Sequence, residues 1–193
     1  MTPAHDAALN RTLDAFRRRA DREGLLEVAY TTMPSPIGTL LLAATRDGLV
    51  RVAFAEDVDA TLVELSGQLS PRLLELPSRL RAAREQLQRY FDRRLTGFDL
   101  PVDRALIGAY ARRVLERTAA IPYGSYASYA QVAREVGTPL AARAVGNALG
   151  ANPIPVVIPC HRVLRTGGAL GGYGGGLDRK RFLLELEGAL ARV

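Results

Sequence analysis

The stretch SYAQVAREVGTPLAARAVGNALG, residues 128–150, says most about the fold of this 193-residue chain. Ser128 followed three residues later by Gln131 is typical of a capping box, in which side chains satisfy free N–H groups at a helix start. Gly137 can adopt the left-handed conformation that ends a helix. The sequence therefore predicts a short first helix between these residues.

A second helix is predicted directly after the first. Thr138 can cap its start, and Pro139 suits the first helical position, where a missing N–H costs nothing. Gly150 then closes it. Two short helices joined by a tight glycine turn are typical of a helix-turn-helix, so we expect a helical C-terminal domain built around this motif.

The composition of the second helix is unusual, because Arg143 is its one long charged side chain. Small residues would let the helix approach a surface closely, while the arginine reaches into that surface. An alanine-rich helix packed tightly inside the domain is the alternative interpretation. The small residues that would form the contact face are Ala141, Ala142, Ala144 and Gly146.

The segment ANPIPVVIPCHRV, residues 151–163, follows the second helix and contains the only cysteine of the chain. Asn152 precedes a proline, which favours a turn. Residues 156–158 have the pattern of a short buried strand. We expect this strand to end at Pro159 and to place Cys160 beside a turn.

Cys160 is followed directly by His161, one of two histidines in the chain. The thiolate is the reactive form of cysteine, and a nearby imidazole or cation lowers the thiol pKa. Adjacent side chains on an extended strand point to opposite faces, so contact between the two requires a turn or a local helix. A lone cysteine can also be a small buried apolar residue with no chemical role.

An imidazole base usually needs an orienting carboxylate, and the last predicted helix supplies Glu187. We expect Asp178 to cap the start of that helix, which puts Glu187 close to its end. The helix macrodipole disfavours a carboxylate there, which indicates a functional reason for it. A solvated surface glutamate is an equally good interpretation of the pattern alone.

A glycine-rich stretch, GGALGGYGGG at residues 167–176, separates the cysteine from the last helix. It lacks the lysine and the spacing of a phosphate-binding loop. We interpret it as a flap over a pocket, with Tyr173 as its anchoring ring. A long hairpin turn is the alternative.

The N-terminal half has a different pattern. Residues 2–23 show helical spacing of Leu9, Leu13, Phe16 and Ala20, so we expect an amphipathic helix that packs on the domain behind it. Strand patterns and an Asp-Gly hairpin turn follow from residue 27 and predict a small antiparallel sheet, and residues 59–95 return to helical spacing. We divide the chain into a helical extension, an α/β domain and a C-terminal domain, at residues 1–26, 27–100 and 101–193.

Composition limits the environment and the partners of the chain. A net charge of +6 favours a polyanionic partner, because cationic side chains gain affinity by releasing counterions from phosphates.

One cysteine excludes an internal disulfide, and no apolar run suits a signal peptide or a membrane span. We expect a soluble cytoplasmic protein with no membrane association. Cys160, His5 and His161 are the only soft ligands, so we expect no zinc or other metal.

Taken together, these motifs resemble those of the methylated-DNA-protein-cysteine methyltransferases, the O6-alkylguanine-DNA alkyltransferases. The similarity is dense from about residue 106 to residue 188 and weaker before that, where SPIGTLLLAAT and LVRVAF resemble the N-terminal sheet of the family. It implies an α+β fold, with a ribonuclease H-like N-terminal domain and a winged-helix-like C-terminal domain. The matching segments are IPYG, SYAQVA, AARAVGNALGANPIPVVIPCHRV and GALGGYGGGLDRKRFLLELEG.

The resemblance also implies a role for each residue of the site. Cys160 would accept the alkyl group, His161 would be its base through a water, and Glu187 would orient His161. Asn152 would brace the turn before the cysteine, and Tyr129 would donate a hydrogen bond to the guanine leaving group. Arg143 would fill the gap left by a flipped base, from a helix in the minor groove. The substrate pocket would be formed by Pro155, Val163, Tyr173 and Gly174.

The implied partner is double-stranded DNA containing O6-alkylguanine, with O4-alkylthymine as a second substrate. Transfer would be stoichiometric, without a cofactor, and we expect a monomer. Two other classes of protein share part of the pattern. A non-catalytic protein that binds alkylated bases would lack the cysteine, and a cysteine hydrolase would not need a small-faced DNA-binding helix.

Overall fold

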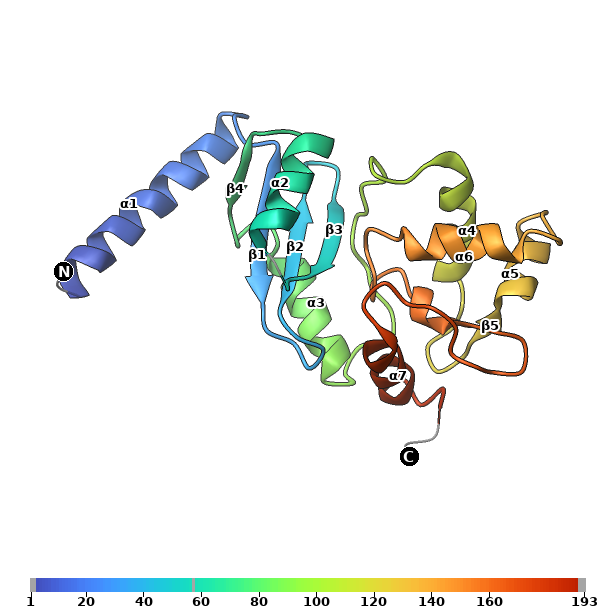
Figure 1. The fold of residues 1–193 in the computed structure, drawn as a ribbon. Coiled ribbons are helices and arrows are strands. Elements are labelled where there is room, and N and C mark those ends of the chain that lie inside the picture. The colour runs from blue at the N-terminus through green and yellow to red at the C-terminus, as the bar shows by residue number, and fades with distance from the viewer. Residues whose placement is uncertain (1–2, 57, 191–193) are drawn as a thin grey trace.

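The computed structural model describes residues 3–56 and 58–190, the side chains of residues 3–10 excepted. Two halves lie side by side, with a sheet in the N-terminal half and a group of helices in the C-terminal half (Figure 1). The α+β class expected from the sequence is therefore confirmed. The N-terminal half contains α1 (Pro3–Arg22), β1 (Val28–Met33), β2 (Leu40–Ala44), β3 (Leu49–Phe54), α2 (Val58–Gln68), β4 (Leu73–Glu75) and α3 (Arg81–Phe91).

The sheet has four strands in the order β3-β2-β1-β4. Strands β1, β2 and β3 are antiparallel neighbours, which confirms the predicted hairpin, but β4 runs parallel to β1. The prediction of helix throughout residues 59–95 is wrong at β4. Pro71 and Pro77 flank this strand and prevent a continuous helix, and the three residues between α2 and α3 that pair with β1 are too few to show an alternating pattern.

Alternate apolar residues of the strands point to opposite faces of the sheet and pack there. Leu41, Ala43 and Val50 pack with Leu65 of α2 on one side. Leu40 and Leu42 face the other side, where they belong to a core that includes Leu87 of α3. Alternate residues of β2 therefore support the two layers, as the strand period of two requires. The second core continues into the C-terminal half and joins the two parts.

Helix α1 projects away from the sheet (Figure 1). The helix itself was predicted, but the expected packing of its apolar residues is wrong for Leu13 and Phe16, which are 39% and 60% exposed. Its last turns contact the rest of the molecule through the buried Ala20 and through ion pairs of Arg17 with Glu75 and of Asp21 with Arg79. The side chain of Leu9 lies outside the described residues. An apolar stripe predicts amphipathicity but does not identify the surface that covers it.

The C-terminal half contains the predicted helix pair. Its elements are α4 (Ala109–Ala119), β5 (Ala127–Ser128), α5 (Tyr129–Glu135), α6 (Ala142–Gly150), the 3-10 helix η1 (Cys160–Arg162), β6 (Val163–Leu164) and α7 (Leu177–Leu186). Strand β5 pairs in parallel with β6, which ties the start of α5 to the segment after the cysteine. Helix α7 lies at the junction of the two halves (Figure 1).

The first helix of the pair begins and ends as predicted. The Ser128 hydroxyl accepts a hydrogen bond from the Gln131 N–H at 3.1 Å, and Gly137 has a φ of 77°. The reciprocal half of the capping box is absent, because the Gln131 side chain donates instead to Glu135. The start predicted for the second helix is wrong, since Thr138 lies in a turn and α6 begins at Ala142.

Two other local predictions are corrected. Residues 156–158 form turns rather than a strand, with an isolated bridge between Pro155 and Ile158. The predicted N-cap Asp178 lies inside the first turn of α7, and the N-cap is Gly176. A negative residue is favourable at either position, so the sequence signal did not separate them.

The edge of β3 that does not pair with β2 forms hydrogen bonds with the segments that lead to the cysteine. The Leu49 N–H donates to the Pro101 carbonyl at 2.8 Å, and the Val52 N–H donates to the Pro153 carbonyl at 2.9 Å. Backbone hydrogen bonds therefore attach both the connection between the halves and the loop before Cys160 to one strand of the N-terminal sheet.

We predict that Gly48→Ala destabilises the protein. Gly48 has a φ of 142°, and a Cβ atom there would lie 2.3 Å from the Pro101 carbonyl oxygen. The free energy of unfolding should fall by about 2 kcal/mol or more, because both strain and a backbone collision are introduced. Gly67→Ala is the control, since a Cβ at Gly67 in α2 meets nothing within 4 Å. Urea unfolding that ranks the two variants equally would contradict this account.

Candidate active site

Cys160 stands at the first residue of η1, which supplies the local helix that contact with His161 requires. Its side chain is 7% exposed and borders a cavity of about 610 Å³ between the two halves. From the C-terminal half the cavity is lined by Asn152, Pro155, Tyr173 and Gly174, among others. From the N-terminal half it is lined by residues that include Arg51 and Phe54 of β3 and the following Glu56. The thiol therefore faces an enclosure that neither half forms alone.

Asn152 holds the loop that precedes the cysteine. Its side-chain amide donates to the Ile158 carbonyl at 2.9 Å, and its carbonyl oxygen accepts from the Ile154 N–H at 3.0 Å. Within this loop Val156 has a φ of 73°, a conformation that costs a β-branched residue about 1–3 kcal/mol. The two hydrogen bonds of Asn152 offset this strain and fix the approach to Cys160.

The environment of Cys160 favours the neutral thiol at rest. Burial raises the pKa of the thiol, while Asn152 and the nearby Lys180 act in the opposite direction. Because the thiolate is the nucleophile, reaction at this cysteine requires a group that removes the proton.

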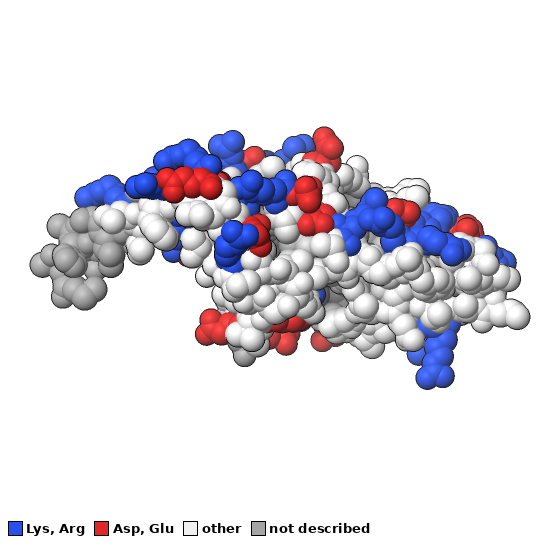
Figure 2. Space-filling view, turned by 90° about the horizontal axis from the view of Figure 1, so that it is seen from above, with Lys and Arg blue, Asp and Glu red and all other residues white. Residues whose placement is uncertain are grey.

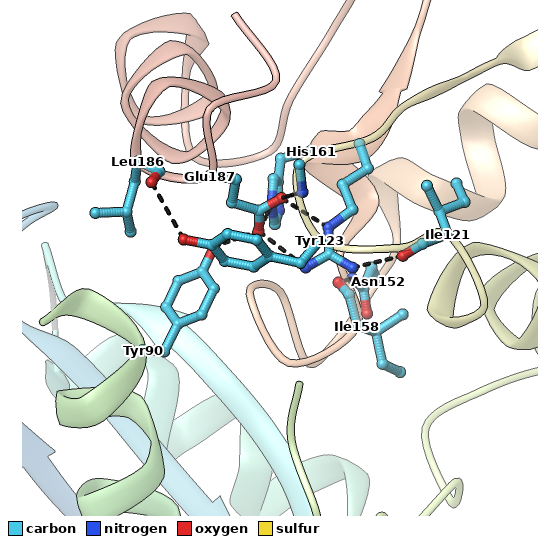
Figure 3. A network of polar contacts seen from close by, with 10 residues as sticks. Tyr90, Ile121, Tyr123, Asn152, Ile158, His161, Leu186 and Glu187 are labelled. Atoms are coloured by element: carbon cyan, nitrogen blue, oxygen red, sulfur yellow. Dashed lines mark hydrogen bonds and ion pairs between the residues drawn. The ribbon is translucent and has the colours of Figure 1, made fainter. Parts of the chain in front are cut away.

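His161 is completely buried beside the cysteine, and its Nε2 lies 2.9 Å from Glu187 Oε1 (Figure 3). Burial lowers the pKa of His161, although Glu187 opposes this effect, so the ring is neutral at neutral pH. The carboxylate accepts a hydrogen bond from the Nε2–H group, which leaves the lone pair of the neutral ring on Nδ1. Among the described residues Nδ1 has no hydrogen-bond partner. This nitrogen can therefore accept a proton.

Glu187 is the centre of a buried polar network, which excludes the interpretation as a surface glutamate. Arg162 donates to both carboxylate oxygens, from Nε at 2.8 Å and from Nη2 at 2.9 Å. The Tyr90 hydroxyl donates to Oε1 at 2.6 Å. Burial alone would raise the pKa of Glu187, but hydrogen bonds from His161 and Arg162 lower it to about 2. The carboxylate is therefore ionised throughout the ordinary pH range.

Lys180 is a buried cation on the other side of the cysteine. Its Nζ donates to the carbonyls of Val163 at 2.6 Å and Gly172 at 3.2 Å. Burial lowers the pKa of Lys180 to about 8, and the proximity of Cys160 opposes that shift. The ammonium has no carboxylate partner in the described part of the chain, so it is placed to stabilise a thiolate.

Tyr129, the first residue of α5, lies between the flap and α6. Its hydroxyl donates to the Gly172 carbonyl at 3.4 Å, and a Cβ on Gly171 would lie 3.0 Å from its ring. Burial and then the nearby Cys160 raise the pKa of Tyr129, so its hydroxyl stays protonated and can donate. Gly146 of α6 faces the same ring, with 3.8 Å between its Cβ position and Cε1.

The glycine-rich flap is held against the sheet by Phe54. The ring of Phe54 meets Tyr173 edge to face at 6.1 Å, and a Cβ on Gly175 would lie 2.4 Å from it. The Arg179 guanidinium lies over the ring of Phe54, 4.5 Å from its centroid, and donates to the Gly175 carbonyl at 3.0 Å. Only glycine fits at position 175 in this arrangement, so Phe54, the last residue of β3, shapes one wall of the cavity.

Helix α6 presents the small residues to the surface. Arg143 and Ala144 are exposed, and Ala141, Ala142 and Gly146 are partly exposed. Arg143 makes no hydrogen bond or ion pair within the described residues. The interpretation as a helix packed inside the domain is therefore wrong for this face, and only Val145, Ala148 and Leu149 of α6 are buried.

Val163 is the one predicted pocket residue that the structure places elsewhere. It is buried in β6 and does not border the cavity, and its carbonyl accepts the hydrogen bond from Lys180. The other three predicted pocket residues, Pro155, Tyr173 and Gly174, border the cavity together with Cys160.

Comparison with known proteins identifies the family to which the chain belongs. The family model described as "6-O-methylguanine DNA methyltransferase, DNA binding domain" matches residues 109–189. The model of the ribonuclease-like domain of the same proteins matches residues 28–104. The chain belongs to the methylated-DNA-protein-cysteine methyltransferase family. Helix α1 lies outside both matched ranges.

Individual methyltransferases support the assignment. The methylated-DNA-protein-cysteine methyltransferase of Mycolicibacterium paratuberculosis is 45% identical over 161 residues, which are 83% of this chain and 92% of that protein. The corresponding protein of Methanosarcina acetivorans is 39% identical and is covered to 98%. The crystal structure of Mycobacterium tuberculosis OGT in complex with DNA has a TM-score of 0.73 at 41% identity, and the match covers 83% of this chain and 93% of that one.

The sequence analysis missed three groups of this methyltransferase site. Arg162 was present in the quoted motif, but arginine is mostly a surface residue unless it is paired. Lys180 has Leu183 and Leu184 at helical spacing, which would have indicated that it faces the core. Tyr90 comes from α3, 97 residues away from Glu187, and no local pattern connects them.

The part of the chain that the structure describes has neither a group of metal-binding side chains nor a helix suited to a membrane. Within the described ranges, no group of three or more histidine, cysteine, aspartate or glutamate side chains could hold a metal ion. None of the described helices is both long and apolar enough to cross a membrane. Figure 2 shows arginines along α1 and over the C-terminal half, with carboxylates between them. On the face seen in Figure 2, Lys and Arg side chains are interspersed with carboxylates rather than gathered in a single patch.

We predict that Lys180→Met reduces the reactivity of Cys160 toward iodoacetamide. Loss of the neighbouring cation should raise the thiol pKa by about one unit, so the pH profile of alkylation should move upward by the same amount. Alkylation at neutral pH should slow about tenfold. Arg181→Met, at an exposed position next along the chain, should leave the profile unchanged. Equal profiles for the two variants would show that Lys180 only binds the two carbonyls.

Proposed function

We propose that this chain repairs O6-alkylguanine in duplex DNA by transferring the alkyl group to Cys160, once per molecule. Members of the family carry out this repair by transfer to a cysteine, and the chain has only one cysteine, in the family's motif position. The observation that carries the proposal is the placement of that thiol on the cavity, next to an imidazole whose other nitrogen is bound to a buried carboxylate.

The first part of the mechanism is activation of the thiol. Nδ1 of His161 takes the Cys160 proton through one water molecule, and Glu187 stabilises the imidazolium that forms. The pKa of Glu187, lowered to about 2, keeps the carboxylate charged for this purpose. The Lys180 ammonium stabilises the thiolate while it exists.

The second part is displacement at the alkyl carbon. The bond from Sγ to carbon forms as the bond from carbon to guanine O6 breaks, and the electron pair leaves with guanine. The Tyr129 hydroxyl donates a hydrogen bond to the departing base, which then takes up a proton from solvent. The product is a thioether, which water does not cleave under ordinary conditions, so each molecule reacts once.

The helix pair α5 and α6 accounts for access to the base. Guanine O6 is buried in a duplex, so the nucleotide has to leave the stack, at a cost of a few kcal/mol. The small face of α6 suits close approach to the minor groove, and the unpaired Arg143 is placed to fill the space that the base vacates. A single chain contains all these groups, so we propose that the monomer is active.

Loss of transfer in Cys160→Ser is the first test. Intact mass after mixing the wild-type protein with a duplex containing one O6-methylguanine should rise by a single methyl group, mapped to Cys160. The serine variant should bind the same duplex and show no added mass. Transfer by the serine variant would exclude Cys160 as the acceptor, and tight binding by the wild-type protein with no change in mass would indicate a non-catalytic lesion-binding protein.

Arg143→Ala tests the role of α6. Repair of the duplex should slow roughly 10- to 100-fold, because the vacated space in the stack is no longer filled. Reaction with the free base O6-benzylguanine needs no base flipping, so its rate should stay within about threefold. Comparable losses on duplex and free base would exclude the wedge role and indicate a general defect. Arg134→Ala, at an exposed position of α5, serves as the charge-matched control.

A further inference from the structure

Tyr90 is the one residue of the N-terminal half that donates a hydrogen bond to the buried network of Glu187 within the described residues. It lies in the last turn of α3 and is completely buried, although it carries a hydroxyl group. That hydroxyl donates to Glu187 Oε1 at 2.6 Å, which is the shortest of the distances from donors to this carboxylate (Figure 3). The two residues are 97 positions apart in the chain.

The hydroxyl of Tyr90 and the ring of His161 share one acceptor atom. Oε1 of Glu187 accepts from Tyr90 and also from His161 Nε2 and Arg162 Nη2, both at 2.9 Å. Oε2 accepts from Arg162 Nε at 2.8 Å. Arg162 therefore holds the carboxylate on both oxygens, while Tyr90 acts only on the oxygen that faces the imidazole.

Aromatic neighbours fix the ring of Tyr90 from three sides. Phe91, Phe98 and Tyr123 lie at ring-centroid distances of 5.4, 5.2 and 6.1 Å. A ring held in this way cannot turn its hydroxyl to another partner. The direction of the hydrogen bond to Glu187 is therefore set by the packing of α3 against the C-terminal half.

We propose that Tyr90 is a positioning residue, through which the N-terminal half orients the Glu187 carboxylate and limits the basicity of His161. The proposal rests on the alkyl transfer to Cys160 described above. In this arrangement the N-terminal half does more than cover the cavity, because it contributes one donor to the groups that remove the thiol proton.

The direction of the effect follows from the shared acceptor. A hydrogen bond from Tyr90 withdraws charge from Oε1, so the carboxylate stabilises the imidazolium of His161 less than it otherwise would. Removal of the hydroxyl should therefore raise the pKa of His161. Since the base has to be neutral to accept the thiol proton, the acid limb of the pH-rate profile should move to higher pH in the variant.

Three other charged or titratable side chains lie around Glu187 and His161. Arg162, from η1, contacts Glu187 directly, and Lys180, from α7, acts on His161 from a greater distance. Tyr123, from the segment after α4, donates to the Leu186 carbonyl at 3.2 Å, not to the carboxylate. None of these groups is altered by a substitution at Tyr90.

The matched experiment compares Tyr90→Phe with Tyr123→Phe. Both variants lose one hydroxyl from the same aromatic cluster, but only the first loses a donor to Glu187. Three quantities are measured for each: the single-turnover rate of methyl transfer from an O6-methylguanine duplex across a pH range, the thermal midpoint, and the pKa of His161 from its imidazole NMR signals in a His5→Gln background.

We expect transfer by Tyr90→Phe to slow up to about tenfold on the acid limb, the change that a rise of one unit in the pKa of His161 produces there. Its acid limb and its His161 pKa should both rise. Tyr123→Phe should keep the wild-type profile and the wild-type His161 pKa. These results should hold whatever the two thermal midpoints are, because loss of stability alone does not move a limb of the profile.

Two outcomes would overturn the proposal. In the first, Tyr90→Phe transfers the methyl group with the wild-type profile and an unchanged His161 pKa. In the second, the two variants shift together, which would assign the effect to the aromatic cluster. A wild-type protein that transfers no methyl group would instead contradict the proposed function, and the His161 pKa of the variants would still report on the contact with Tyr90.

Discussion

The burial of one carboxylate is the constraint on which the rest of this structure depends. An ionised glutamate without partners would cost several kcal/mol inside a protein, so Glu187 is tolerated only because other side chains compensate its charge. Arg162 supplies that compensation on both oxygens, and His161 and Tyr90 complete it. These donors come from η1 and α3, so the requirement to satisfy one side chain brings three separate parts of the chain together.

The same requirement explains why the two halves form one functional unit. Strand β3 binds the loop before Cys160 through the hydrogen bond from Val52 to Pro153, and Phe54 at its end supports the flap. The C-terminal half carries every group that reacts or contacts DNA in the proposed mechanism. The N-terminal half supplies the wall of the cavity and a donor to the carboxylate. Similarity to the family extends over both halves, in agreement with this division of roles.

Local signals in the sequence were correct for the first helix of the pair and wrong at two helix starts, where Thr138 and Asp178 are not the N-caps. The cap at Ser128 and the turn at Gly137 depend only on contacts within one helical turn, and both were predicted. Other errors arise where a longer-range contact competes with a local preference. Strand β4 forms because β1 offers a partner, and residues 156–158 turn because Asn152 binds the backbone at Ile154 and at Ile158. The exposed residues Leu13 and Phe16 of α1 have a related cause. The spacing of apolar residues predicts a helix, but it does not predict which part of the molecule packs against that helix.

By itself, the sequence determined the chemistry that is available, namely one thiol next to an imidazole, a helix with small residues and a single arginine, and a carboxylate near a helix end. These features depend on identity and short spacing, and they sufficed to indicate the family. Only the tertiary structure decided how the groups act on one another. Whether Glu187 is buried, which nitrogen of His161 is free and which residue of α3 reaches the carboxylate all depend on packing between segments far apart in the chain, and no local pattern records that packing.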